Sequence, residues 1–203
     1  MTTAILIVAG YVAGSIPSGY WVARAFRRVD IRRLGSGNIG ASNVWREFGP
    51  AYGLPVAVLD TAKGFVPALL ATIYVGHLAG VLAGGAAMLG HWRPLFLGFQ
   101  RGGKMVATCG GAFLGVAPVV GGIGAAVWVA TFAAFRYASV ASIIAACALP
   151  VIAVALGEPW PVIAFGAGAA VAVVVLHRAN ISRLRAGTEN RFRLRRPKTQ
   201  PSG

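Results

Sequence analysis

Long apolar segments separated by short polar stretches dominate this chain of 203 residues. Hydrophobic residues make up 57% of it and charged residues only 12%, a composition typical of membrane proteins rather than of soluble domains. We distinguish seven apolar segments, at residues 4–24, 52–76, 78–91, 105–117, 119–135, 138–156 and 160–177. The sequence therefore predicts an all-α integral membrane protein with seven transmembrane helices. Because a full span needs about 20 residues, we expect the short segments 78–91 and 105–117 to be tilted, re-entrant or packed inside the bundle.

The basic residues predict how the helices are oriented. With the amino terminus outside and seven alternating spans, every Lys and Arg except Lys63 falls in a cytoplasmic stretch. The outside turns, near residues 77, 118 and 158–161, contain none. Because cytoplasmic loops carry the excess of Lys and Arg, we predict an N-terminus outside and a C-terminus in the cytoplasm. We expect one polytopic domain over residues 1–192 and a basic, mobile tail over 193–203.

The net charge of +14 does not indicate a partner nucleic acid. A nucleic-acid-binding domain gathers its basic residues on one face of a soluble fold, whereas here they punctuate apolar segments and report topology and anionic lipid headgroups. Cys109 and Cys147 lie in apolar segments, and the three histidines are scattered along the chain. We therefore expect no disulfide, no metal site and no cofactor.

The stretch from Gly35 to Gly49, GSGNIGASNVWREFG, is the most polar one near the first span. Backbone amides freed by glycine, together with hydroxyl, amide and guanidinium side chains, are what a protein uses to hold an oxyanion. The candidate ligands are Ser36, Asn38, Ser42, Asn43 and Arg46. We predict an anion site at the membrane surface, and the anion we expect is a phosphate.

A second candidate phosphate site is the loop Gly98–Lys104, in which Gly102 and Gly103 precede Lys104 at the start of an apolar segment. Backbone N–H groups, the amino end of a helix and the ammonium could all point at one anion, and Thr108 follows as a further candidate ligand. The spacing is not that of a P-loop. The alternative is a tight turn with a lysine that reaches to the interface.

A third polar stretch, residues 177–191, follows the last apolar segment. His177 and Asn180 are one helical turn apart and so face the same way, and Glu189 could orient an arginine or a loop. The alternative is that they are simply interface residues at a helix end. All three polar stretches fall on the predicted cytoplasmic side, where we expect them to converge on one site.

Two features inside the apolar segments concern packing. Asp60 and Lys63 are three residues apart, so on a helix they share a face and can pair; either they lock the helix to its neighbours or they act directly in the site. The pairs Gly80/Gly84 and Gly111/Gly115 have GxxxG spacing, which indicates close packing of helices.

Five stretches together resemble the bacterial membrane glycerol-3-phosphate acyltransferases that use acyl phosphate as donor. They are GSIPSGYWVAR (14–24), DIRRLGSGNIGASNVWREFG (30–49), LDTAKGFVPALL (59–70), LGHWRPLFLGFQRGGKMVAT (89–108) and HRANISRLRAGTENRF (177–192). They occur in the family's order and extend over most of the chain. Met105 departs from the family pattern, which usually has glycine after the lysine.

The resemblance implies a seven-helix protein of the bacterial inner membrane. It implies transfer of a long-chain acyl group from acyl phosphate, made by a separate soluble enzyme, to the sn-1 hydroxyl of glycerol 3-phosphate, which gives lysophosphatidic acid. By position it nominates Lys104, His177 and Arg46 as catalytic residues. The residues nominated for substrate binding are Ser36, Asn38, Asn43, Gly102, Gly103 and Asn180, and we add Thr108, with Asp60, Lys63 and Glu189 in support.

The acceptor of the hydroxyl proton stays open between His177 and a phosphate oxygen of a bound substrate, the second of which we favour. Two other functions also remain. One is a transporter for a phosphorylated solute, which an intramembrane Asp60/Lys63 pair and a basic mouth would suit. The other is a structural membrane protein whose basic tail recruits a soluble partner.

Overall fold

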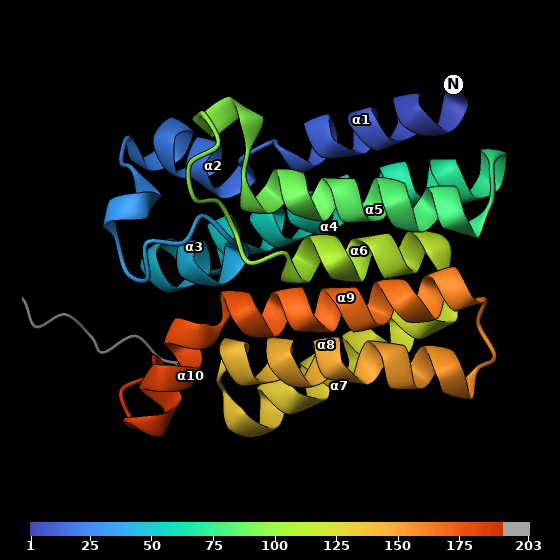
Figure 1. The fold of residues 1–203 in the computed structure, drawn as a ribbon. Helices are drawn as coiled ribbons and strands as arrows, with labels where there is room; N and C mark the ends of the chain where they lie inside the picture. The colour runs from blue at the N-terminus through green and yellow to red at the C-terminus, as the bar shows by residue number, and fades with distance from the viewer. Residues whose placement is uncertain (193–203) are drawn as a thin grey trace, which may run out of the picture.

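The computed structural model describes residues 1–192, and these fold into a bundle of helices without strands (Figure 1). The predicted mobile tail, 193–203, lies outside the described residues. The long helices are α1 (Thr2–Gly14), α4 (Pro50–Tyr74), α5 (His77–Trp92), α6 (Val106–Val116), α7 (Pro118–Phe135), α8 (Ala138–Ala155) and α9 (Trp160–Leu176). Shorter helices are α2 (Ser18–Arg27), η1 (Ile31–Arg33), α3 (Ala41–Phe48), η2 (Leu95–Leu97) and α10 (Arg178–Arg185).

Each predicted apolar segment corresponds to one long helix, except that the first is broken between α1 and α2. By length and composition, α1 with α2, α4, α7 and α8 could each cross a membrane, and α9 with α10 makes a fifth if that bent pair is one span. α5 has 16 residues and α6 has 11, so both are short, as predicted. The all-helical membrane fold is confirmed in this coarser form, and seven full spans stay a prediction.

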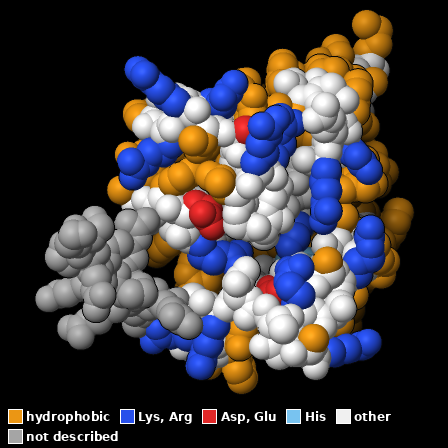
Figure 2. Space-filling view, turned by 90° about the vertical axis from the view of Figure 1, so that its left-hand side faces the viewer, with side chains coloured by type: hydrophobic (Ala, Val, Ile, Leu, Met, Phe, Trp, Pro, Cys, Tyr) orange, Lys and Arg blue, Asp and Glu red, His pale blue; other side chains and the backbone are white. Residues whose placement is uncertain are grey.

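The long helices run back and forth along one direction, so that the connections fall at two ends of the bundle (Figure 1). We call the end that carries α2, α3 and α10 the polar end. The Lys and Arg side chains gather on it (Figure 2), whereas the N-terminus lies at the opposite end (Figure 1). The predicted segregation of basic residues is therefore a property of the three-dimensional bundle.

Glycines let α4 and α6 approach each other at the centre of the bundle. A Cβ added at Gly64 of α4 would collide with the carbonyl oxygen of Thr108, and one at Gly111 of α6 would collide with that of Thr61. At Gly115 it would lie 2.7 Å from the carbonyl oxygen of Phe65. The prediction of close helix packing is confirmed at this crossing, where small residues allow backbone-to-backbone contact.

Asp60 and Lys63 form the predicted pair inside α4, with 2.7 Å between the carboxylate oxygen and Nζ. Both side chains are buried. Nζ of Lys63 also donates to the carbonyl oxygen of Ile16, 3.0 Å away in the break between α1 and α2. His91 of α5 places Nδ1 3.8 Å from the same Asp60 oxygen. The pair therefore ties three helices together, which favours its structural interpretation over a direct role in the site.

We expect Gly111→Ala to lower the stability of the bundle, because its methyl group would overlap the backbone of α4. Overpacking of this kind costs about 1–3 kcal/mol. The adjacent Gly110→Ala is the matched control, since a Cβ there meets nothing within 4 Å. Thermal unfolding in detergent would compare the two, and equal midpoints would contradict the proposed crossing.

Candidate active site

Asn43, in the first turn of α3, shapes the first polar loop. Its side chain is 2% exposed; Oδ1 accepts from the backbone N–H of Ser36 at 3.0 Å, and Nδ2 donates to the carbonyl oxygens of Leu34 and Asn38 at 3.1 and 2.9 Å. The amide is thus engaged inside its own loop. Asn43 positions Ser36, whose exposed side chain remains available to a ligand.

Asn38 joins this loop to the second one. Its Oδ1 accepts from the N–H of Gly40 at 2.8 Å, and its Nδ2 donates to the carbonyl oxygen of Gly102 at 3.3 Å. Residues 64 positions apart are therefore held side by side, as the predicted convergence of the polar stretches requires.

The glycines before Lys104 do not form the predicted cradle of backbone N–H groups. Gly102 donates its N–H to the carbonyl oxygen of Trp92, and Gly103 donates to that of His91, both at 2.9 Å. A Cβ at Gly103 would collide with the imidazole ring of His91. The physical reason for the two glycines is thus the close approach of this loop to the end of α5, and in this structure their amides point into the protein.

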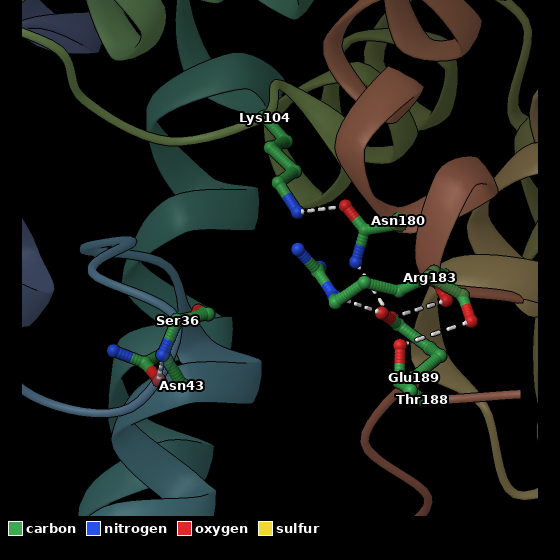
Figure 3. A network of polar contacts seen from close by, with 8 residues as sticks. Ser36, Asn43, Lys104, Asn180, Arg183, Thr188 and Glu189 are labelled. Atoms are coloured by element: carbon green, nitrogen blue, oxygen red, sulfur yellow. Dashed lines mark hydrogen bonds and ion pairs between the residues drawn. The ribbon is translucent and has the colours of Figure 1, made fainter. Parts of the chain in front are cut away.

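Lys104 contacts the third polar stretch across the site (Figure 3). Its Nζ donates to Oδ1 of Asn180 at 2.5 Å, and Nδ2 of Asn180 donates to Oε1 of Glu189 at 2.6 Å. Ser139 donates its hydroxyl to the same oxygen at 2.8 Å, and Nε of Arg183 donates to Oε2 at 2.7 Å. Glu189 orients an arginine, as predicted, and it also fixes Asn180 and hence Lys104.

The chain turns back after α10 and so places the Glu189 carboxylate in this network. The N–H of Thr188 bonds the carbonyl of Arg183, and that of Gly187 bonds Leu184, with Gly187 at φ +69°, an arrangement that ends many helices. The Glu189 side chain is 4% exposed. Burial alone would raise the pKa of its carboxyl group, but hydrogen bonds from Asn180, Ser139 and Arg183 hold that pKa below its usual value.

The site carries more positive than negative charge. Burial lowers the pKa of Lys104 to about 8; Glu189 opposes this shift, and Arg183, Arg101 and Arg46 add to it. Lys104 therefore remains mostly protonated at pH 7 while surrounded by other cations. Such a site favours an anionic ligand, because the anion would relieve the repulsion between the cations.

Arg46 lies on the last turn of α3 and is partly buried. Its Nε donates to the carbonyl oxygen of Ser42 at 3.0 Å, and its guanidinium lies 5.2 Å from the centroid of the Phe192 ring. Within residues 1–192 its two terminal nitrogens make no hydrogen bond. They form a planar fork that suits a phosphate.

His177 occupies the bend between α9 and α10 and is 3% exposed. Nδ1 lies 2.8 Å from the carbonyl oxygen of Val173; because a carbonyl can only accept, we assign the proton to Nδ1, which leaves Nε2 as an acceptor. In this tautomer the imidazole is neutral, and Nε2 can accept a hydrogen bond from a ligand.

Met105, the departure from the family's glycine, has φ +68°. A residue with a side chain in this left-handed conformation costs roughly 1–2 kcal/mol, which explains why glycine suits the position. The Met105 side chain is 3% exposed within the main hydrophobic core. Burying such a side chain contributes about 1.5–3 kcal/mol, so its packing offsets the backbone strain.

The structure does not bring every nominated residue to this network. Thr108 is fully buried in α6, and its hydroxyl has no hydrogen-bond partner among the described residues. Conversely, the sequence did not indicate the roles of Ser139, Arg183 and His91. Ser139 lies within an apolar segment, and no local pattern links it to Glu189; Arg183 is one of several arginines in its stretch.

Comparison with known proteins identifies relatives of this chain. The family model for glycerol-3-phosphate acyltransferase matches residues 4–187. A glycerol-3-phosphate acyltransferase of Desulforudis audaxviator (strain MP104C) is 46% identical over 200 residues, covering 95% of this chain and 98% of the relative. One from Roseiflexus sp. (strain RS-1) is 49% identical over 193 residues, covering 92% and 94%.

Solved structures agree with these matches. The glycerol 3-phosphate form of PlsY, an integral membrane glycerol 3-phosphate acyltransferase, superposes with a TM-score of 0.90 and 38% identity, covering 95% of this chain and 96% of that one. Its lysophosphatidic acid form gives 0.87 and 37%, with the same coverage.

The contact between Gly103 and His91 predicts a coupled effect on stability. We expect Gly103→Ala to destabilise the protein by about 1–3 kcal/mol through overpacking. In a His91→Ala background the added methyl group has room, so the same substitution should cost much less. Chemical unfolding of the four proteins in a double-mutant cycle measures this coupling, and strictly additive costs would show that the ring does not fill this space.

Proposed function

Because the chain belongs to the glycerol-3-phosphate acyltransferase family, we propose that it transfers a fatty acyl group from acyl phosphate to the sn-1 hydroxyl of glycerol 3-phosphate. The products are lysophosphatidic acid and phosphate. The observation that carries this proposal is the convergence of three polar stretches, which bring Arg46, Lys104, Asn180 and His177 to one cation-rich site at the polar end.

The main task of such a site is to hold two phosphate groups close together. Arg46 offers a planar fork and Lys104 a point charge, while Ser36 and Asn180 supply further hydrogen bonds. Neutralising both phosphates allows the hydroxyl of one substrate to lie against the acyl carbon of the other. Positioning and charge stabilisation of this kind are major contributions to catalysis.

No covalent intermediate is needed, because acyl phosphate is already an activated mixed anhydride. The glycerol hydroxyl oxygen attacks the acyl carbon, and the bond from that carbon to the phosphate oxygen breaks, so that phosphate leaves with the electron pair. Neither cysteine serves as a nucleophile in this proposal: Cys109 is buried in α6, and Cys147 lies in α8 among apolar residues.

We assign the hydroxyl proton to a phosphate oxygen of a bound substrate. A phosphate oxygen of a bound substrate needs no protein base, and a phosphate group, with a second pKa of about 6, can accept a proton near neutral pH. The neutral imidazole then serves to bind the substrate, with Nε2 accepting a hydrogen bond from it.

The same proposal includes the arrangement in the membrane. Seven helices cross the inner membrane of a bacterium, the N-terminus lies outside, and the polar end faces the cytoplasm, where a soluble enzyme supplies long-chain acyl phosphate. The segregation of Lys and Arg to the polar end supports this orientation. The acyl chains lie among the membrane lipids, into which the product leaves.

We expect purified protein to form lysophosphatidic acid from glycerol 3-phosphate and acyl phosphate, but not from acyl-CoA. Removal of the ammonium in Lys104→Ala should abolish turnover, and Arg46→Lys should lower it by losing the fork. Product formation is measured in detergent beside a homologue of known activity. Counterflow of labelled glycerol 3-phosphate in sealed vesicles without new lipid would instead identify a transporter and contradict the proposal.

The role of His177 is tested by His177→Gln, which keeps hydrogen-bonding capacity but cannot act as a base. We expect a raised KM with kcat largely retained. A fall in kcat of about 100-fold or more at unchanged KM is the size expected for a lost general base and would reverse the assignment.

A further inference from the structure

Two cavities at the polar end lie outside the site described above. One has a volume of about 420 Å³ and the other about 330 Å³. They share Asp30 and Arg33, so they adjoin each other. Arg24 and Arg28 line the first cavity, and Arg101 the second; we call them together the arginine cavities. None of the residues proposed to bind the reacting groups lines either one.

The guanidinium groups of the arginine cavities are available to a ligand. Those of Arg24, Arg28, Arg33 and Arg101 are exposed and make no hydrogen bond or ion pair with the rest of residues 1–192. Several guanidinium forks that line adjoining cavities can bind the oxygens of a phosphate group.

Asp30 and a fifth arginine, Arg32, already form an ion pair with each other. Arg32 donates from Nε and a terminal nitrogen to the Asp30 carboxylate, at 2.9 and 2.7 Å, and from its other terminal nitrogen to Gln100 at 2.6 Å. Arg32 holds the pKa of Asp30 below its usual value. Asp30 lines both cavities, whereas Arg32 and Gln100 line the second, and the Asp30 charge is neutralised by Arg32.

Exposed aromatic side chains on α2, which carries Arg24, and on η2, which precedes the loop of Arg101, indicate that the ligand is a lipid. Trp21 of α2 and Phe96 of η2 are 46% and 49% exposed and lie 6.0 Å apart between ring centroids. Phe26, in the last turn of α2, is also exposed. Aromatic rings next to arginines are typical of the headgroup layer of a membrane.

We propose that the arginine cavities bind the phosphate group of an anionic phospholipid, with Arg33 between the two cavities as the central contact. The lipid would rest against the two loops that carry Ser36 and Lys104, since Gly37 and Gln100 also line the second cavity. This binding needs no catalytic turnover.

Mass spectrometry of intact protein–lipid complexes in detergent tests this, with phosphatidylglycerol as the probe and phosphatidylcholine as the neutral comparison. We expect Arg33→Gln/Arg101→Gln to raise the apparent Kd for phosphatidylglycerol about tenfold, the scale of a lost charge-assisted contact. The matched control, Arg178→Gln/Arg185→Gln, removes the same charge from exposed positions of α10 that line neither cavity and should leave the Kd unchanged.

Three further measurements test where the lipid binds and whether the ligand is a lipid rather than free phosphate. Lys104→Ala should keep the binding, and an excess of inorganic phosphate at matched ionic strength should not displace the lipid. In the unsubstituted protein, phosphatidylglycerol with brominated chains should quench a fluorescence component that Trp21→Phe removes. Equal losses in both double variants, loss in Lys104→Ala, displacement by inorganic phosphate, or no quenching of Trp21 would each overturn the proposal.

Discussion

A charged side chain inside hydrocarbon is costly, and the arrangement of this protein depends on that constraint. The Lys and Arg residues of the described chain, Lys63 excepted, are collected in the connections at one end of an alternating helix bundle. Polar stretches that are more than 60 residues apart in places, such as Asn38 and Gly102, are thereby brought onto the same surface. The exception is informative, because Lys63 is compensated by Asp60 and by the carbonyl of Ile16.

Glycine serves the same physical purpose in the bundle and in the site, namely close approach of backbones. At the crossing of α4 and α6 it removes side chains that would collide with carbonyl groups. In the loop before Lys104 it lets the backbone lie on His91 and donate its N–H groups to the end of α5. A rigidly held loop in turn fixes where the Lys104 side chain begins, and Asn180 fixes where its ammonium ends.

Much of this could be predicted because it depends on local pattern and on the membrane. Hydrophobic segments gave the helices, i,i+3 spacing gave the Asp60–Lys63 pair, and charge alternation placed the polar stretches together. What could not be predicted depends on contacts between distant elements. The direction of the Gly102 and Gly103 amides is set by α5, and Ser139 meets Glu189 only because α8 begins beside the turn after α10. Thr108 has the sequence position of a ligand, but the turn of α6 places it against α4.

The polar network needs negative charge for its stability, whereas the proposed chemistry needs positive charge that is left free. Glu189 contributes to both. Its carboxylate accepts hydrogen bonds from Asn180, Ser139 and Arg183. The negative charge offsets part of the local positive charge and so stabilises the network. It does not neutralise Lys104, whose pKa stays lowered by burial and by neighbouring cations, nor does it occupy the terminal nitrogens of Arg46. A second carboxylate in this network would reduce the repulsion between its cations in the unliganded protein. It would also compete with a substrate phosphate for the same donors. In the proposed function, Glu189 therefore orders the donors of this network while leaving positive charge for an anionic substrate to neutralise.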